Sequence, residues 1–229
     1  VTDIVPHKTA IELVAEPELP AFDQIADSRT PALPKNIMLQ HFRGVEIKTE
    51  HDVFDPECAV LMDFRCDQSR GIHFIYVLPY TKNRALVEST MFSPELAPDN
   101  FYDKAISDYC DHILKTGKTM VLRREQGVIP MGFLTPRDDK VDAIGGNGGA
   151  IRPSSGYAFV FIQRQIETAL ARQKTHGQLC FKAPHKRLDL WMDAVFLAVI
   201  KKQPEYAPRL FAAIAKALSG DEMALFMSG

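Results

Sequence analysis

The sequence predicts a mixed α and β protein, on the border of the α+β and α/β classes, in which an antiparallel sheet is followed by helices. Between residues 37 and 91, segments rich in β-branched and aromatic residues alternate with turn residues, which is typical of a sheet meander. After residue 155, apolar residues recur mainly at helical spacing. With 229 residues, 46% of them hydrophobic, the chain is long enough to bury a core.

The strands are expected in two groups, separated by the proline-containing stretch 30–34. The first group covers 1–5, 9–14 and 22–26. The second group forms the meander and covers 37–49, 59–66, 72–78 and 84–91, with hairpin loops at 69–71 and 79–83. A further strand at 120–124 leads into a stretch at 125–130 in which Gly127 and Pro130 indicate a turn.

The helices are expected at 100–116, 156–173, 186–201, 205–218 and 221–227. Asn100 can cap the first of them, and Gly117 can end it. Ser155 is the candidate N-cap of the second helix, whose apolar face includes Phe159 and Ile166.

The composition excludes several classes of function. A formal net charge of -2 gives no electrostatic reason to expect nucleic acid. The four cysteines lack zinc spacing and are expected to be reduced, as in a cytosolic protein, and the seven histidines suggest no metal site. No segment has the apolar length of a membrane span, and no secretory signal is visible. The chain begins without methionine, and both ends look like cuts through a longer protein.

The stretch 144–159 carries five glycines and one proline between a short apolar run and a predicted helix. Glycine allows positive φ and a close approach of a ligand to the main chain. A helix that starts behind such a turn directs free N–H groups at it, which suits a phosphate or another anion. The alternative is a tight strand-to-helix turn without a ligand.

Glu88 is the first candidate for acid chemistry. It shares a strand face with Leu86 and Thr90 in the middle of an apolar segment. If that face is covered, loss of hydration raises the pKa of the carboxyl group, as a general acid requires. The alternative is a solvated face on which Glu88 pairs with Arg84 or Lys82.

Glu125 is the second candidate carboxylate, and its alternative is a turn carboxylate that accepts backbone N–H bonds. The aromatic residues Phe74, Tyr76 and Tyr80 on the meander can be core residues or a wall that stabilises a cation.

Several motifs follow one another in a specific order. They are Asp27-Ser-Arg29, Gln40-His-Phe42-Arg-Gly44, Leu61-Met-Asp-Phe-Arg65, Phe74-Ile-Tyr-Val-Leu-Pro79, Leu86-Val-Glu-Ser-Thr90, Arg124-Glu-Gln-Gly-Val-Ile-Pro-Met131 and Gly148-Gly-Ala-Ile-Arg-Pro-Ser-Ser-Gly-Tyr157. In this order they resemble the lycopene cyclase family of FAD-binding proteins, in its bacterial β-cyclase branch, from about residue 20 to the C-terminus.

The resemblance implies a fragment of a flavoprotein-hydroxylase-like FAD-binding fold with an antiparallel sheet that covers the substrate. Residues 1–30 would be a remnant of the FAD-binding domain, 31–135 the substrate domain, 136–175 the flavin-contacting turn and helix, and 176–229 a C-terminal helical region. The glycine-rich segment that anchors the dinucleotide at the start of such a fold is missing. The residues implied in cofactor binding are Asp27, Arg29, Gly146, Asn147, Gly148, Gly149, Pro153, Ser155, Gly156 and Tyr157.

The reaction implied is cyclisation of the linear ψ-ends of lycopene, or of a related linear carotenoid, to β-ionone rings without net redox change. Reduced FAD would stabilise the cation, with NAD(P)H as reductant. The family's acidic motif reads Leu86-Val-Glu-Ser-Thr90, so Glu88 would be the acid, and Glu125 the proton acceptor or an anchor of the flavin loop. An apolar substrate implies a cytoplasmic protein that contacts the membrane peripherally. The helix at 191–200 is a candidate for this contact, and the alternative is that its apolar face packs in the core.

Two other functions stay open at this point. One is a flavin-dependent monooxygenase acting on an apolar substrate, and the other is an isoprenoid-binding module without catalysis.

Overall fold

The computed structural model describes residues 3–6, 11–14, 22, 24–137, 141–177 and 179–228. The expected strand starts at residues 1–2 and 9–10 lie outside the described residues. The chain divides into two compact units. One contains residues 1–35 and 132–195, and the other contains residues 36–131 and 196–229.

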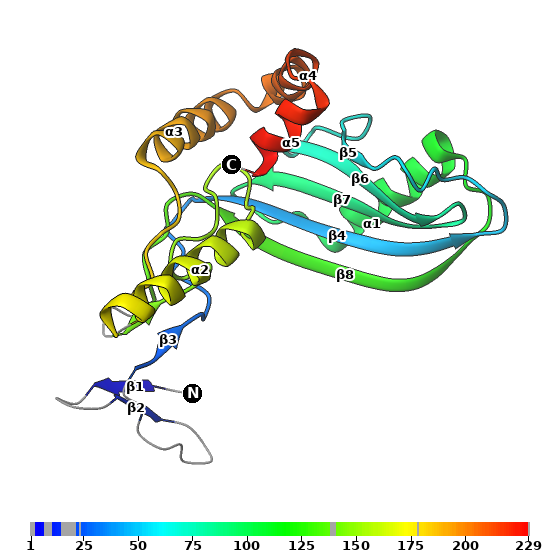
Figure 1. Cartoon of the computed structure of the whole chain (residues 1–229). Helices are drawn as coiled ribbons and strands as arrows, with labels where there is room; N and C mark the ends of the chain where they lie inside the picture. Colours follow the sequence, from blue (N-terminus) through cyan, green and yellow to red (C-terminus); the bar gives the residue numbers. More distant parts are fainter. Residues whose placement is uncertain are drawn as a thin grey trace. The chain divides into compact units, whose positions relative to one another are not determined.

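The unit of residues 36–131 and 196–229 is built on a five-stranded sheet of order β5-β6-β7-β4-β8 (Figure 1). Its strands are β4 (Met38–Thr49), β5 (Val60–Asp63), β6 (Ile72–Thr81), β7 (Arg84–Ser93) and β8 (Thr119–Met131). Every neighbouring pair is antiparallel. The predicted meander is therefore present, and β8 is an edge strand beside β4.

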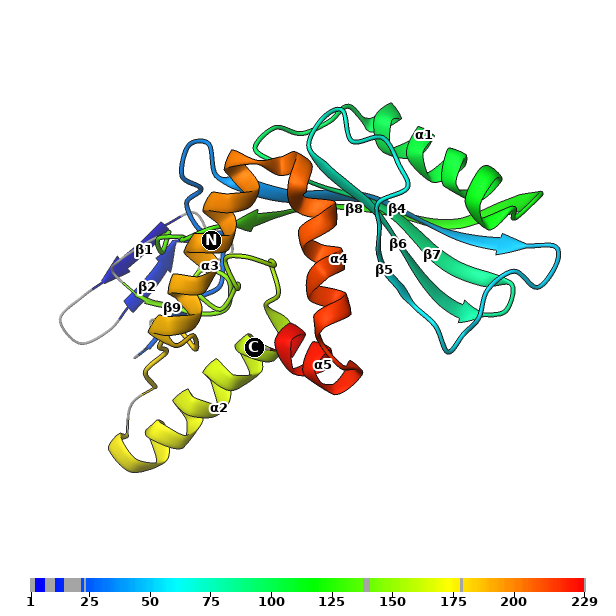
Figure 2. The same ribbon diagram turned by 90° about the horizontal axis from the view of Figure 1, so that it is seen from above.

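The helix α1 (Asp99–Tyr109) covers one face of this sheet and continues into a π-helical turn, Cys110–Leu114 (Figure 2). Its buried residues Ile106 and Tyr109 pack with Val45, Val87 and other residues that alternate along the strands. Because side chains alternate across a strand, Glu88 and Thr90 lie on the opposite face.

The C-terminal helices pack on that opposite face, around Phe74 and Phe92. The residues of this segment that join the cluster include Ile200, Ala207 and Phe211. Ala207 and Phe211 belong to α4 (Ala207–Ala217), which follows a 3-10 turn, Pro204–Tyr206, and is followed by α5 (Gly220–Ser228). The helix α3 (Arg187–Lys202) runs across the division between the two units.

The other unit is less regular. It contains a hairpin of β1 (Asp3–Pro6) and β2 (Ile11–Val14), a short parallel pair of β3 (Ala26–Asp27) and β9 (Asp142–Ala143), and α2 (Phe159–His176). Among the described residues, no helix combines the length and the apolar character that crossing a bilayer requires.

Three sequence predictions of local structure are wrong. The helix α1 begins at Asp99 and its N-cap position is Pro98, so Asn100 lies inside the helix and does not cap it. The strand predicted to end at residue 124 continues as β8 to Met131, so Glu125 lies within a strand and not in a turn. The helix α2 begins at Phe159, and its N-cap position is Ala158, which makes no side-chain capping bond. Ser155 therefore lies in the preceding turn and does not cap this helix.

Candidate functional site

Glu88 lies at the centre of β7 on the sheet face that the C-terminal helices partly cover. Its side chain is partly buried. The Thr90 hydroxyl donates a hydrogen bond of 2.6 Å to Glu88 Oε1. Arg84, which the ion-pair alternative assigned to Glu88, binds Glu46 instead, with a distance of 2.5 Å between Arg84 Nε and Glu46 Oε1. Glu88 is thus desolvated without pairing with Arg84, its predicted cation.

Gly44 connects Glu88 with Glu125. In the sheet register, Gly44 of β4 lies opposite Glu88 of β7 on one side and opposite Glu125 of β8 on the other. A Cβ atom on Gly44 would lie 3.1 Å from Glu125 Cγ and 3.1 Å from Leu86 Cδ1. The Glu125 side chain therefore leans over Gly44, and the two candidate carboxyl groups share one face of the sheet.

The electrostatics follow from this placement. Burial is the main cause that raises the pKa of Glu88 to about 7, and the charge of Glu125 raises it further, against the hydrogen bond from Thr90. Arg123 Nη2 donates to Glu125 Oε2 over 2.9 Å, so Glu125 carries a partner of opposite charge. The Glu88 carboxyl group of the pair is therefore suited to hold a proton near neutral pH.

Aromatic side chains surround the carboxyl groups on this face. Tyr76 of β6 lies opposite Glu88 in the register and is partly buried. Phe74 is fully buried and belongs to the core, whereas Tyr80 is 52% exposed at the end of the strand. Phe42 of β4 lies opposite Thr90, with its ring against Gly127.

The face beneath α1 holds a separate buried polar network. His73 Nε2 and Ser89 Oγ are 2.8 Å apart, and His41 Nε2 and Ser93 Oγ are also 2.8 Å apart. The Tyr102 hydroxyl lies 2.6 Å from His41 Nδ1. These groups satisfy one another within the protein core.

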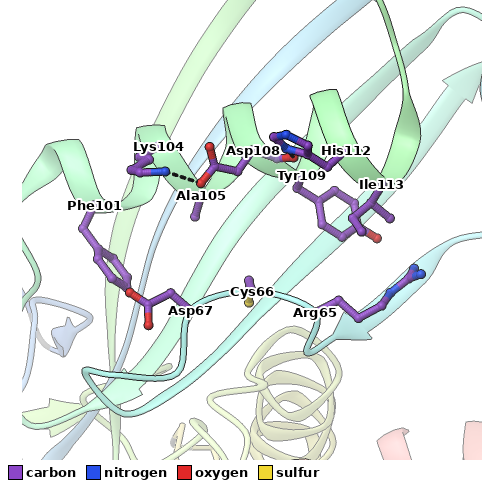
Figure 3. A pocket seen from close by; sticks show the side chains of 10 residues that line it. All are labelled: Arg65, Cys66, Asp67, Phe101, Lys104, Ala105, Asp108, Tyr109, His112 and Ile113. Carbon is purple, nitrogen blue, oxygen red and sulfur yellow. Dashed lines mark hydrogen bonds and ion pairs between the residues drawn. The ribbon is translucent and has the colours of Figure 1, made fainter.

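A cavity of about 480 Å³ lies on the same side, between α1 and the segment after β5 (Figure 3). Its lining combines cationic and acidic side chains, including Arg65, Lys104, Asp67 and Asp108. None of the residues predicted for catalysis or cofactor binding lines this cavity. Because it lies on the α1 side, it opens away from the sheet face of Glu88.

The glycine-rich turn follows β9 directly in the other unit. Gly145 and Gly149 have φ values of 64° and 73°, which only glycine adopts without strain. A Cβ atom on Gly148 would lie 2.4 Å from the carbonyl oxygen of Ala143, and one on Gly146 would lie 2.9 Å from Ile151 Cδ1. The conformation of the turn therefore requires these glycines whether or not a ligand binds there.

The side chains of Asn147 and Asp27 are buried and form hydrogen bonds to other groups of the protein. Asn147 Nδ2 donates to the carbonyl oxygen of Asp27 over 3.1 Å, and Asn147 Oδ1 accepts from the amide of Arg137 over 2.7 Å. The Asp27 carboxylate accepts from Arg29 Nε and Nη2, both at 2.9 Å. This pairing is the main cause that lowers the pKa of Asp27. A ligand at this turn would have to be contacted mainly by the main chain.

The segment that contains Pro153, Ser155, Gly156 and Tyr157 forms a closed turn before α2. The amide of Gly156 donates to the carbonyl of Arg152 over 2.9 Å, and Gly156 has a φ of 71°. Tyr157 is 42% exposed. The helix start is thus ten residues beyond Gly149, and not directly behind the glycines.

Several residues that shape these sites are not among those predicted from the sequence. Gln165 of α2 is buried; its Oε1 accepts from the Gly145 amide over 2.8 Å and its Nε2 donates to the Gly148 carbonyl over 2.9 Å. Gly44 and Gly127 were not considered as parts of a site. A glycine inside a long apolar strand is the signal that could have indicated a close approach of neighbouring groups.

Several known proteins are similar in sequence to this chain. A lycopene beta-cyclase of Paracoccus sp. is 31% identical over 142 residues, which are 57% of this chain and 35% of that protein. A chloroplastic neoxanthin synthase of Solanum tuberosum is 30% identical over 138 residues, which are 54% of this chain and 27% of that protein. The chain thus spans about a third of the length of these curated relatives.

Solved structures agree with the predicted fold class. A geranylgeranyl bacteriochlorophyll reductase-like protein from Thermoplasma acidophilum has a TM-score of 0.50 at 12% identity, over 94% of this chain and 52% of that one. A variant of HpxO from Klebsiella pneumoniae, complexed with FAD, has a TM-score of 0.55 at 10% identity, over 99% of this chain and 65% of that one. At this identity the likeness concerns the fold, and it confirms the hydroxylase-like class with an antiparallel sheet and C-terminal helices.

A family model described as lycopene cyclase protein matches residues 9–228, nearly the whole sequence. The motif order, the fold and this match agree, and the chain belongs to the lycopene cyclase family.

Proposed function

We propose that the protein containing this chain is a carotenoid end-group cyclase that converts the ψ-ends of lycopene, or of a related linear carotenoid, to β-ionone rings. The observation that carries the proposal is the Glu88 carboxyl group, which burial and Glu125 bring to a pKa of about 7. A proton donor in this range can deliver a proton to an alkene and remain protonated between turnovers at neutral pH.

The residues of the sheet face have distinct roles in this proposal. Glu88 donates its proton to the terminal double bond, the internal double bond attacks the resulting cation, and a proton leaves to complete the ring. Thr90 fixes the Glu88 carboxyl by its 2.6 Å hydrogen bond. Glu125, paired with Arg123, lies on the same face and can accept the departing proton or stabilise the cation.

FAD is the proposed cofactor, in its reduced form and with NAD(P)H as reductant. Bound near the substrate, reduced flavin would contribute negative charge that stabilises a carbocation. In this chain Gly146, Gly148 and Gly149 would approach it through the main chain, and the turn of Pro153, Ser155, Gly156 and Tyr157 would lie beside it. The side chains of Asn147, Asp27 and Arg29 bind one another or the protein backbone, so they would hold the shape of the glycine-rich turn.

The apolar substrate would reach the protein from a membrane. We therefore also propose that the protein contacts the membrane surface peripherally, from the cytoplasmic side. On α3 the residues Leu188, Trp191, Val195 and Val199 repeat at helical spacing and are each more than 40% exposed. Lys201 and Lys202 close the same helix and would lie near anionic headgroups. Flotation of the full-length protein with anionic vesicles tests this, and Trp191→Ser is expected to weaken it.

The decisive experiment expresses the full-length protein in lycopene-accumulating cells and analyses the carotenoids. The expected result is β-ring products for the wild type and lycopene alone for Glu88→Gln, which retains the shape of the side chain but has no proton to give. Products that carry oxygen, formed with stoichiometric NAD(P)H consumption, would favour the monooxygenase alternative. Unchanged lycopene with retained binding for both proteins would favour an isoprenoid-binding module.

A further inference from the structure

Phe42 has an unusual place on the sheet face of Glu88. Its register partners are Thr90 on β7 and Gly127 on β8. A Cβ atom on Gly127 would lie 2.5 Å from Phe42 Cζ and 2.8 Å from Phe42 Cε1. The ring thus occupies the space in which any other residue at position 127 would place its side chain.

The direction of the ring follows from these distances. Its far end lies over β8, so the Phe42 side chain leans across the sheet toward the edge strand and away from Thr90. A side chain usually stands roughly perpendicular to the sheet. Gly127 therefore allows an aromatic ring to lie low on this face, and both residues are partly exposed.

Phe42 shares the sheet face of the two carboxyl groups, one level along from them, and its ring leans toward the strand that carries Glu125. Phe42 is two residues from Gly44 on β4, and Gly44 lies directly opposite Glu88. Residues in this diagonal relation on one face are separated by roughly 7 Å, within reach of aromatic side chains. Glu125 and Gly127 repeat the same relation on β8. The face thus has two carboxyl groups at one level and a flat ring at the next.

We propose that Phe42, laid over Gly127, is a substrate-contacting residue that holds the ring-closing end of the hydrocarbon beside Glu88 and stabilises its positive charge. This inference rests on the proposed function. A hydrocarbon end has no polar group that could be oriented by hydrogen bonds, so apolar surface must orient it. The face of an aromatic ring also attracts a cation.

The chemistry assigns Phe42 no bond-making step. The proton moves from the Glu88 carboxyl to the CH carbon of the terminal double bond, which leaves a tertiary cation on the carbon that bears two methyl groups. The new carbon–carbon bond to this cation takes its electron pair from the internal double bond, and the final proton leaves to a carboxylate. Phe42 faces the cation between the first and the last of these steps. Its contribution is therefore expected in kcat more than in KM.

The test uses the full-length protein with flavin and reductant, and lycopene in detergent micelles. Phe42→Leu keeps an apolar side chain but removes the ring, and we expect kcat to fall about tenfold or more while KM changes by less than about threefold. Phe42→Tyr should recover most of the loss. The control Phe133→Leu changes a phenylalanine that is 52% exposed and lies outside this unit, and it should retain wild-type kcat.

A second measurement needs no turnover. In the Glu88→Gln background, lycopene bound after gel filtration is measured by its absorbance. Gly127→Ala should push the ring off the sheet and lower the bound lycopene, whereas the same change added to Phe42→Ala should have no further effect. Gly220→Ala is the matched control, because a Cβ atom there would meet nothing within 4 Å.

The outcomes separate the inference from the proposed function. Wild-type kcat in Phe42→Leu, or additive effects of Gly127→Ala and Phe42→Ala, would overturn the role of Phe42 while a cyclising wild type upholds the function. A wild type that does not cyclise lycopene would overturn both. If the melting temperature shows that Phe42→Leu is unfolded, Phe42→Met replaces it, with the same expected fall in kcat.

Discussion

Replacing the proposed acid should stabilise the protein in alkaline solution. Burial raises the pKa of Glu88 from its ordinary value of 4.5 to about 7. The unfolded chain loses this proton near 4.5 and the folded chain near 7, so the folded state binds more protons between these pH values. The contribution of Glu88 to stability is then fully present below pH 4.5 and is lost as pH rises through about 7.

The size of the effect follows from the same two values. The difference between 4.5 and about 7 corresponds to about 3 kcal/mol in the free energy of unfolding, because one pKa unit is about 1.4 kcal/mol. Glu88→Gln has the shape of the protonated acid and can still accept the Thr90 hydrogen bond. It should exceed the wild type by about 3 kcal/mol at pH 8 and by less than about 1 kcal/mol at pH 5.

Urea unfolding of both full-length proteins at pH 5 and pH 8 measures this difference. Glu57→Gln, at an exposed position, is the control and should show no such pH-dependent gain. A Glu88→Gln variant that gains no stability over the wild type between pH 5 and pH 8 would contradict this prediction. That result would mean that the folded protein keeps the Glu88 carboxylate as well hydrated as the unfolded chain does.

Three further changes test the electrostatics and the glycine turn. Glu125→Gln removes a negative charge near Glu88, so the pKa of Glu88 should fall and the alkaline limb of the rate profile should move to lower pH, as kcat/KM measured against pH would show. Burial lowers the pKa of His41 from 6.5 to about 4, so this histidine stabilises the fold above pH 6.5 and the stability is lost as pH falls toward 4. Urea unfolding at pH 7.5 and pH 5 should show about 2 kcal/mol of this loss in the wild type relative to His41→Gln. Asn147→Asp places a carboxylate against the carbonyl oxygen of Asp27 in place of a donor, and should lower the free energy of unfolding by about 1–3 kcal/mol, which thermal melting detects.

The regular strands could be predicted from the sequence because one face of the sheet is buried by α1. Val45, Ile47 and Val87 lie at alternate strand positions that face α1, and this period of two fixes the register. The continuation of β8 could not be predicted in this way. Gly127 and Pro130 are typical of turns, but Gly127 makes room for a neighbouring ring and Pro130 lies in an edge strand, where proline is tolerated.

The candidate site was predicted in part. Glu88 could be identified as a carboxyl group within an apolar strand, and Glu125 as a second acid, but their relation depends on the pairing of three strands. The sequence separates Gly44 from Glu88 and Glu125 by 44 and 81 residues, and only the register places all three side by side. Likewise, the glycines of the turn are a pattern typical of a ligand-binding loop. The structure requires Gly148 for another reason, because a side chain there would clash with the carbonyl oxygen of Ala143.

The two strand glycines explain how one sheet face can hold an acid, its charged neighbour and an aromatic surface. A side chain on Gly44 would crowd Glu125 and Leu86, so glycine there leaves room for the Glu125 side chain to lie over β4. Glycine at position 127 gives the ring of Phe42 its low position. Each glycine weakens the strand that contains it, since it adds backbone entropy to the unfolded chain and packs nothing. A fold selected for stability alone would fill both positions, so a glycine at the level of Glu88 and a second glycine at the next level, opposite Phe42, support a function for this face.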